Sequence, residues 1–95
     1  MAAYFIVNLN VTNPKGFHRY SKAAPSVVAK YGGKYIVRGG EFKTLEGDWN
    51  PVMVVVLEFP SMERARQFYD SEEYEPLLAL RKESTDSQVV LVDGV

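Results

Sequence analysis

Residues 52–59 form an apolar segment that does not alternate with polar residues, and this segment constrains the fold more than any other feature. In a strand, every second residue from Val52 points to one face of the sheet, and every second residue from Met53 points to the other. Residues 89–92 have the same character. An antiparallel sheet with one face in water alternates apolar and polar residues. Both faces of the central strands are therefore expected to be covered.

The predicted elements follow the order strand, helix, strand, strand, helix, strand. Asn13 before Pro14 is a helix start signal, and Ser61 is another. This order is the split βαβ, ferredoxin-like arrangement, an α+β fold with a four-stranded antiparallel sheet. A chain of 95 residues suits one domain spanning 1–95. The strands are expected at 2–11, 34–38, 52–59 and 88–92, and the helices at 14–31, from Ser61, and after the capping segment 70–73.

Several residues predict interruptions of these elements. Pro25 lies inside helix 14–31 and is expected to kink it or divide it in two. The pair Gly39-Gly40 predicts a bulge or a close backbone approach. Residues 41–45 are expected to continue the second strand, and residues 46–51 are rich in turn formers that close a hairpin.

The second face of the sheet predicts an assembly. A ferredoxin-like chain places both helices on one face, which would leave several apolar strands exposed on the other. Such a patch, of several hundred Å², exceeds what soluble monomers usually carry. Because most soluble oligomers are two-fold homodimers, we expect a homodimer with sheets packed face to face, with room for a cavity.

Composition excludes several classes of protein. Without cysteine there is no disulfide, thiolate nucleophile or cysteine-ligated metal, and a single histidine excludes an all-histidine metal site within one chain. No apolar run reaches the roughly 18 residues of a membrane span, and no signal-peptide pattern is present, so a cytoplasmic protein is expected. A pI near 5.8 and a third strand without stacking aromatics argue against nucleic-acid binding. We expect no cofactor, no metal, no membrane and no nucleic-acid partner.

Charge is unevenly distributed along the chain. Residues 1–43 hold seven basic groups and one acid, for a net +6, whereas residues 44–95 hold four basic groups and eleven acids, for a net −7. The two halves are expected to attract each other within one domain; pairing between subunits is the alternative.

Short motifs along nearly the whole chain carry a family resemblance. In order they are Tyr31-Gly32-Gly33, Val37-Arg38-Gly39-Gly40, Leu45-Glu46-Gly47-Asp48-Trp49, Glu58-Phe59-Pro60-Ser61, Phe68-Tyr69-Asp70-Ser71-Glu72-Glu73-Tyr74, Arg81 and Val92-Asp93-Gly94. Together they resemble the domain-of-unknown-function 1330 family of the dimeric α/β-barrel group, which implies a homodimeric barrel and no established function. The wider group includes cofactor-free monooxygenases, muconolactone isomerases and haem-handling enzymes. Phe17 stands where the family often has a tyrosine, so a hydroxyl role there is not expected.

Arg38 is the first candidate for ligand binding. A charge inside a strand requires solvent, a partner or a ligand. If the hairpin turns around residues 47–50, Arg38 lies nearly opposite Glu58, and a structural ion pair is one interpretation. In the other, Arg38 binds a carboxylate or another anion beside the amides of Gly39 and Gly40.

Five other side chains are candidates with simpler alternatives. His18 carries the only imidazole of the chain and is a weak candidate for a catalytic acid or base, or is a solvated helix residue. Trp49 is expected to anchor a dimer interface rather than stack on a ligand. Tyr69 and Tyr74 pack in the core or line a pocket. Arg81 either interacts favourably with the dipole at the end of its helix or faces the same anion as Arg38.

Two functions from different classes are consistent with these residues. The first is a homodimeric small-molecule-binding protein, with or without cofactor-independent catalysis, whose ligand is a small carboxylate-bearing or aromatic metabolite. The second is a non-catalytic interaction or regulatory module with a solid hydrophobic interior and no ligand cavity.

Overall fold

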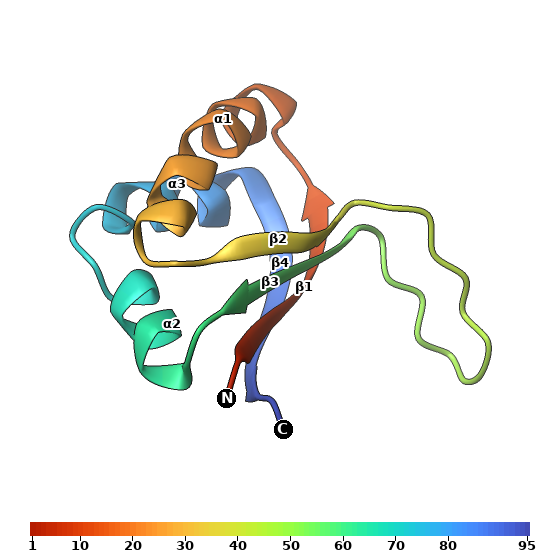
Figure 1. Cartoon of the computed structure of the whole chain (residues 1–95). Coiled ribbons are helices and arrows are strands. Elements are labelled where there is room, and N and C mark those ends of the chain that lie inside the picture. The colour runs from red at the N-terminus through yellow and green to blue at the C-terminus, as the bar shows by residue number, and fades with distance from the viewer.

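A computed structural model describes all residues, Met1–Val95, as a four-stranded sheet with three helices packed on one face (Figure 1). A long loop projects from the sheet on the side away from the helices. The elements are β1 (Ala3–Val11), α1 (Pro14–Lys30), β2 (Lys34–Arg38), β3 (Val54–Phe59), α2 (Met62–Tyr69), α3 (Glu75–Ser84) and β4 (Thr85–Asp93).

The sheet has the strand order β2-β3-β1-β4, and every neighbouring pair is antiparallel. The two central strands, β1 and β3, are the ones with the longest apolar runs. This topology confirms the predicted ferredoxin-like α+β fold.

The predicted helix starts are confirmed, and two boundaries differ. Asn13 Oδ1 accepts a hydrogen bond from the Gly16 amide, and Ser61 Oγ accepts one from the Arg64 amide. Ser71 Oγ accepts from the Tyr74 amide, although the helix that follows begins only at Glu75. The last strand begins at Thr85 rather than at residue 88, because its first residues pair with the end of β1.

Of the two effects predicted for Pro25, a division of the first helix does not occur, since α1 is one element from Pro14 to Lys30. A proline lacks the amide that would bond to the carbonyl four residues earlier, here that of Ser21. Arg38 Nη2 donates to this carbonyl at 2.9 Å and to Ser21 Oγ at 3.1 Å. The guanidinium of Arg38 therefore supplies the donor that Pro25 removes.

The connection between β2 and β3 is longer and less regular than predicted. Residues 41–45 do not continue the strand, and β3 begins at Val54 rather than at residue 52. Gly39 has a φ of +70°, a left-handed conformation that glycine adopts easily, and its amide still donates to the Val54 carbonyl at 2.9 Å. The bulge lies between Tyr35 and Val37, before the glycine pair.

Aromatic rings fill the space between the sheet and the helices. Phe5, Phe59, Phe68 and Tyr74 are buried, and the Phe59 and Phe68 ring centroids are 5.0 Å apart. Phe5 meets Phe59 edge to face at 5.6 Å. This cluster fixes the helices on the inner face of the sheet.

Gly33 is needed because there is no room for a side chain. A Cβ atom at this position would lie 2.5 Å from the Phe59 ring and 2.8 Å from Val28 Cγ1, both fully buried. We expect Gly33→Ala to lower the free energy of unfolding by about 1–3 kcal/mol through overpacking. Gly40→Ala is the control: nothing lies within 4 Å of that Cβ, and a change within about 0.5 kcal/mol is expected. Urea unfolding of both variants measures the difference, and equal effects would refute the packing argument.

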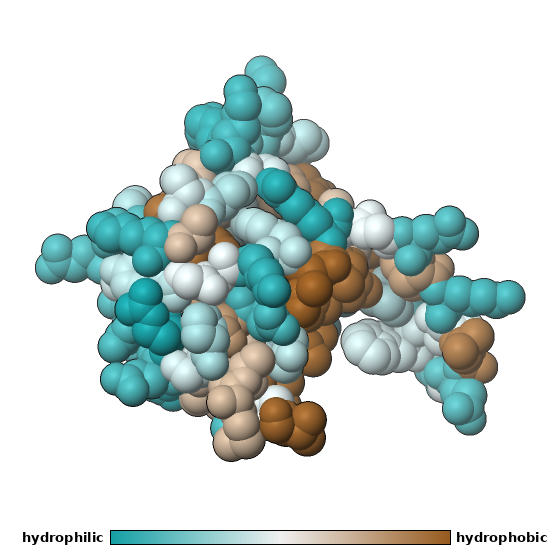
Figure 2. All heavy atoms as spheres, in the orientation of Figure 1, coloured by the Kyte–Doolittle hydropathy of each residue, from teal (hydrophilic) through white to brown (hydrophobic).

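The outer face of the sheet, away from the helices, is apolar. Val37 is paired with Val56, Val56 with Ile6, and Ile6 with Val90, so these four side chains form one row across the sheet. Ile6 is 37% exposed and Val90 58% exposed. Figure 2 shows this apolar area in brown, between the body of the molecule and the projecting loop. The predicted assignment of alternate residues of the third strand to opposite faces is confirmed.

Charge pairing joins the two halves of the chain. Lys30 Nζ lies 2.6 Å from Glu73 Oε2, and Lys34 Nζ lies 3.2 Å from Glu58 Oε1. Each pair joins a base of the positive half to an acid of the negative half within one domain.

The helices are too short or too polar to cross a lipid bilayer.

Candidate functional site

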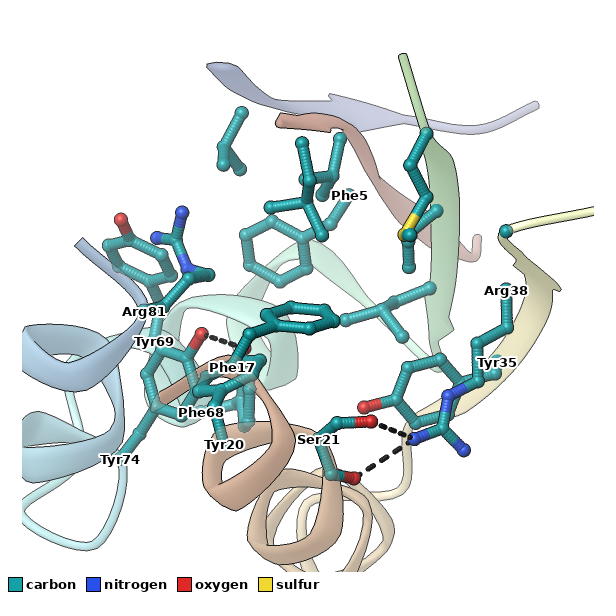
Figure 3. Close-up of a pocket in the computed structure, with 17 residues that line it drawn as sticks. Phe5, Phe17, Tyr20, Ser21, Tyr35, Arg38, Phe68, Tyr69, Tyr74 and Arg81 are labelled. Carbon is teal, nitrogen blue, oxygen red and sulfur yellow. Dashed lines mark hydrogen bonds between the residues drawn. The ribbon is translucent and has the colours of Figure 1, made fainter. Parts of the chain in front are cut away.

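A cavity of about 260 Å³ lies between the inner face of the sheet and the helices (Figure 3). Most of its lining is hydrophobic, including Phe5, Phe17, Val55 and Leu57. For comparison, an apolar cavity of roughly 150 Å³ accommodates benzene. The cavity therefore has room for one ring with substituents.

Five of the predicted site residues line this cavity, and three do not. Arg38, Gly39, Tyr69, Tyr74 and Arg81 belong to its wall. His18 is exposed on α1, Gly40 has no neighbours within 4 Å of its Cβ position, and Trp49 is 64% exposed in the projecting loop. The histidine is therefore not placed to act on a molecule inside the cavity.

The ion pair of Arg38 with Glu58, one of the two interpretations of Arg38, does not form. Arg38 is paired with Val55 in the sheet, and Glu58 with Lys34. Glu58 also accepts a hydrogen bond from the Tyr4 hydroxyl at 3.0 Å. Hydrogen bonds from Lys34 and then Tyr4 hold the pKa of the Glu58 carboxyl below its usual value.

The β-bulge explains why Arg38 lies on the cavity side. Lys34 points to the outer face with Glu58, and strict alternation would place Arg38 on that face too. Because the register shifts between Tyr35 and Val37, Val37 takes the outer position and Arg38 turns inward. Its guanidinium lies 4.6 Å from the centre of the Tyr35 ring and bonds to Ser21.

At the other end of the cavity, Arg81 is surrounded by phenols and is buried. Its Nη1 donates to Ser87 Oγ. The Tyr20 and Tyr74 hydroxyls are 2.6 Å apart. Burial, together with the Tyr74 neighbour, raises the pKa of Tyr20 above its usual value. Tyr20 is therefore protonated at neutral pH and acts as a hydrogen-bonding group rather than as a base.

Tyr20, Ser21, Tyr35 and Phe17 are lining residues that sequence reasoning did not select. The helical periodicity placed Phe17 and Tyr20 on the apolar face of the first helix and therefore predicted that they are core residues. In the structure their rings are stacked, with centroids 6.0 Å apart. A phenylalanine at position 17 leaves this part of the wall apolar. Periodicity could identify the inward face but not the empty space beside it.

The cavity thus has an apolar, aromatic middle and a guanidinium group at each end. Such a space can hold a flat ring and neutralise an anionic substituent. No group of three or more His, Cys, Asp or Glu side chains is arranged to hold a metal ion.

Solved structures of known proteins share this fold. The RPA0582 protein of unknown function from Rhodopseudomonas palustris is 16% identical, with a TM-score of 0.80 over 99% of this chain and 82% of that chain. SnoaB, a cofactor-independent oxygenase from Streptomyces nogalater, is 13% identical, with a TM-score of 0.66 over 99% of this chain and 93% of its own. An antibiotic biosynthesis monooxygenase is 16% identical, with a TM-score of 0.58 over 100% and 99% of the two chains.

The sequence identifies the family more directly than these distant structures do. No curated protein sequence matches the chain. The model of the family described as "Domain of unknown function (DUF1330)" matches residues 2–95. Because this match spans almost the full length, the chain belongs to the DUF1330 family.

Proposed function

We propose that this protein is a cytoplasmic homodimer that binds a small aromatic molecule with a carboxylate or similar anionic group in the cavity of each chain. The observation that carries the proposal is the cavity of about 260 Å³, with an aromatic lining and guanidinium groups from Arg38 and Arg81. Aromatic walls favour ring stacking, and a guanidinium favours a carboxylate.

The apolar outer face supports the homodimer. The row Val37, Val56, Ile6 and Val90 runs across the full width of the sheet without an interrupting charge. A second copy would cover this row with an identical one, which is the self-complementary contact of a two-fold dimer. The loop that projects away from the helices (Figure 1) carries the exposed Trp49 and Leu45 and would reach the partner.

Catalysis without a cofactor is an extension of this proposal. SnoaB is a cofactor-independent oxygenase with the same fold. The comparison supports testing for a chemical change of the bound molecule, by mass spectrometry of the molecule before and after incubation with the protein. The cavity favours this proposal over the alternative function, an interaction module with a solid interior.

Val55 offers a test of binding from a single position. It lines the cavity at the centre of the sheet, where it is paired with Val7 and Arg38. Val55→Trp is expected to fill the space and weaken binding of an aromatic acid such as benzoate at least about 100-fold, because the ring loses its site. Isothermal titration calorimetry measures the affinity.

Val55→Ala is the matched control. It removes side-chain volume at the same place, so benzoate binding should persist. Equal binding by the tryptophan and alanine variants would show that the ligand lies elsewhere. Native mass spectrometry of the protein purified without added ligand gives a separate test, with a retained small molecule as the expected result.

A further inference from the structure

Arg81 differs from every other cationic side chain in the structure because it is buried. It is 5% exposed and lies near the end of α3, where its side chain lines the cavity. Figure 3 shows Arg81 beside Tyr69 and Tyr74 at one end of the cavity, with Arg38, Tyr35 and Ser21 at the other. The two guanidinium groups are therefore separated by the apolar middle.

No carboxylate balances the charge of Arg81. The two ion pairs of the chain are Lys30 with Glu73 and Lys34 with Glu58. Arg81 donates to the neutral hydroxyl of Ser87, and its other polar neighbours are the phenols of Tyr74, Tyr20 and Tyr69. An arginine stays charged at all physiological pH values, so this cation is buried without an anion.

A buried charge without a counter-charge is unfavourable unless something compensates it. The phenols supply dipoles but no negative charge. The cavity adjoins the guanidinium, so an external anion inside it can approach Arg81 closely. An anion there would be held in a site with little water, where charge-assisted hydrogen bonds are strong.

Arg38, by contrast, does not need an anion to balance a buried charge. It is exposed, and its Nη2 already donates to the Ser21 carbonyl that Pro25 leaves free. Its guanidinium also packs on the Tyr35 ring. Solvent and these neutral partners satisfy Arg38 without a ligand.

We propose that the anionic group of the ligand binds to Arg81, with its ring extending through the apolar middle toward Arg38. The inference rests on the proposed function and assigns an orientation to the bound molecule. The ligand class is then a single-ring aromatic acid whose carboxylate lies beside the hydroxyls of Tyr74 and Tyr20.

Benzoate and benzamide are suitable probes because they share a ring and differ in charge. Calorimetry of the unchanged protein should show roughly 10- to 100-fold tighter binding of benzoate. Arg81→Gln should bring the ratio of the two affinities close to one, while benzamide still binds. Arg81→Lys should keep benzoate preferred, since the charge remains. Arg19→Gln removes an exposed charge of α1 outside the cavity and should leave the ratio unchanged.

Other results would overturn the inference in distinguishable ways. If neither probe binds the unchanged protein, the proposed function itself fails. If both bind equally, or if Arg38→Gln rather than Arg81→Gln abolishes the preference, the cavity function stands and the assignment to Arg81 is wrong. A measurement that needs no variant is the nitrogen NMR signal of the Arg81 side chain, which should shift with benzoate and not with benzamide. No shift with benzoate would refute the contact.

Discussion

Ile6→Asp is expected to convert the proposed homodimer into a monomer. Ile6 lies at the middle of the outer row, paired with Val56 on one side and Val90 on the other. In a two-fold contact each substitution appears twice, so the change would bring two carboxylates into an apolar interface. Burying unpaired charges costs several kcal/mol each, which is enough to abolish a small interface. The molecular mass measured by light scattering should fall from twice the 10.7 kDa mass of one chain to the mass of one chain.

A charge placed elsewhere controls for this experiment. Ser26 is exposed on α1, on the opposite side of the sheet, and Ser26→Asp adds the same charge there. This variant should remain dimeric. A mass near 10.7 kDa for the unchanged protein at micromolar concentration would refute the dimer. If the Ile6→Asp protein is still dimeric, the interface lies on another surface.

Phe59→Ala is expected to produce the largest loss of stability. The side chain is fully buried between β3 and the helices and contacts Phe5 and Phe68. Removing a buried phenylalanine ring costs about 3–5 kcal/mol, from lost burial and from the cavity that remains. In a domain of this size the Tm should fall by at least about 12 °C.

Phe42→Ala is the matched control for Phe59→Ala. Phe42 is 45% exposed in the loop after β2, and its loss should change stability by less than about 0.5 kcal/mol. Calorimetric scans of the unchanged protein and the two variants should be made at one protein concentration, because the proposed dimerisation would contribute to the apparent Tm. Similar Tm values for the two variants would contradict the assignment of the core.

Local patterns predicted most of the fold. The non-alternating run in β3 indicated a central strand, and the caps Asn13 and Ser61 indicated two helix starts, because these signals depend on near neighbours in the chain. Pro25 does not divide its helix, and Arg38, thirteen residues further along, supplies a donor to the carbonyl that the proline leaves free. A contact between two elements is not visible in local propensity.

The candidate site was predicted in part. Tyr69 and Tyr74 were selected from their place beside a capping segment and Arg81 from its place near a helix end, and the structure brings all three to the cavity. Tyr20 was read as core because periodicity reports which face of a helix is inward, not whether the space opposite it is filled. His18 was selected for its chemistry alone, and chemistry does not determine position.

The sequence by itself determined the order of the elements, the ferredoxin-like topology and the apolar character of both sheet faces, because these follow from periodicity and turn chemistry along the chain. Tertiary structure alone decided the partners of the charges. A bulge of one residue in β2 turned Arg38 toward the cavity and left Glu58 to Lys34. Packing of α3 against the sheet buried Arg81 without an acid. A register shift and a packing void arise only when distant segments meet. Together they decided between the two interpretations of Arg38 and placed a guanidinium at each end of a cavity.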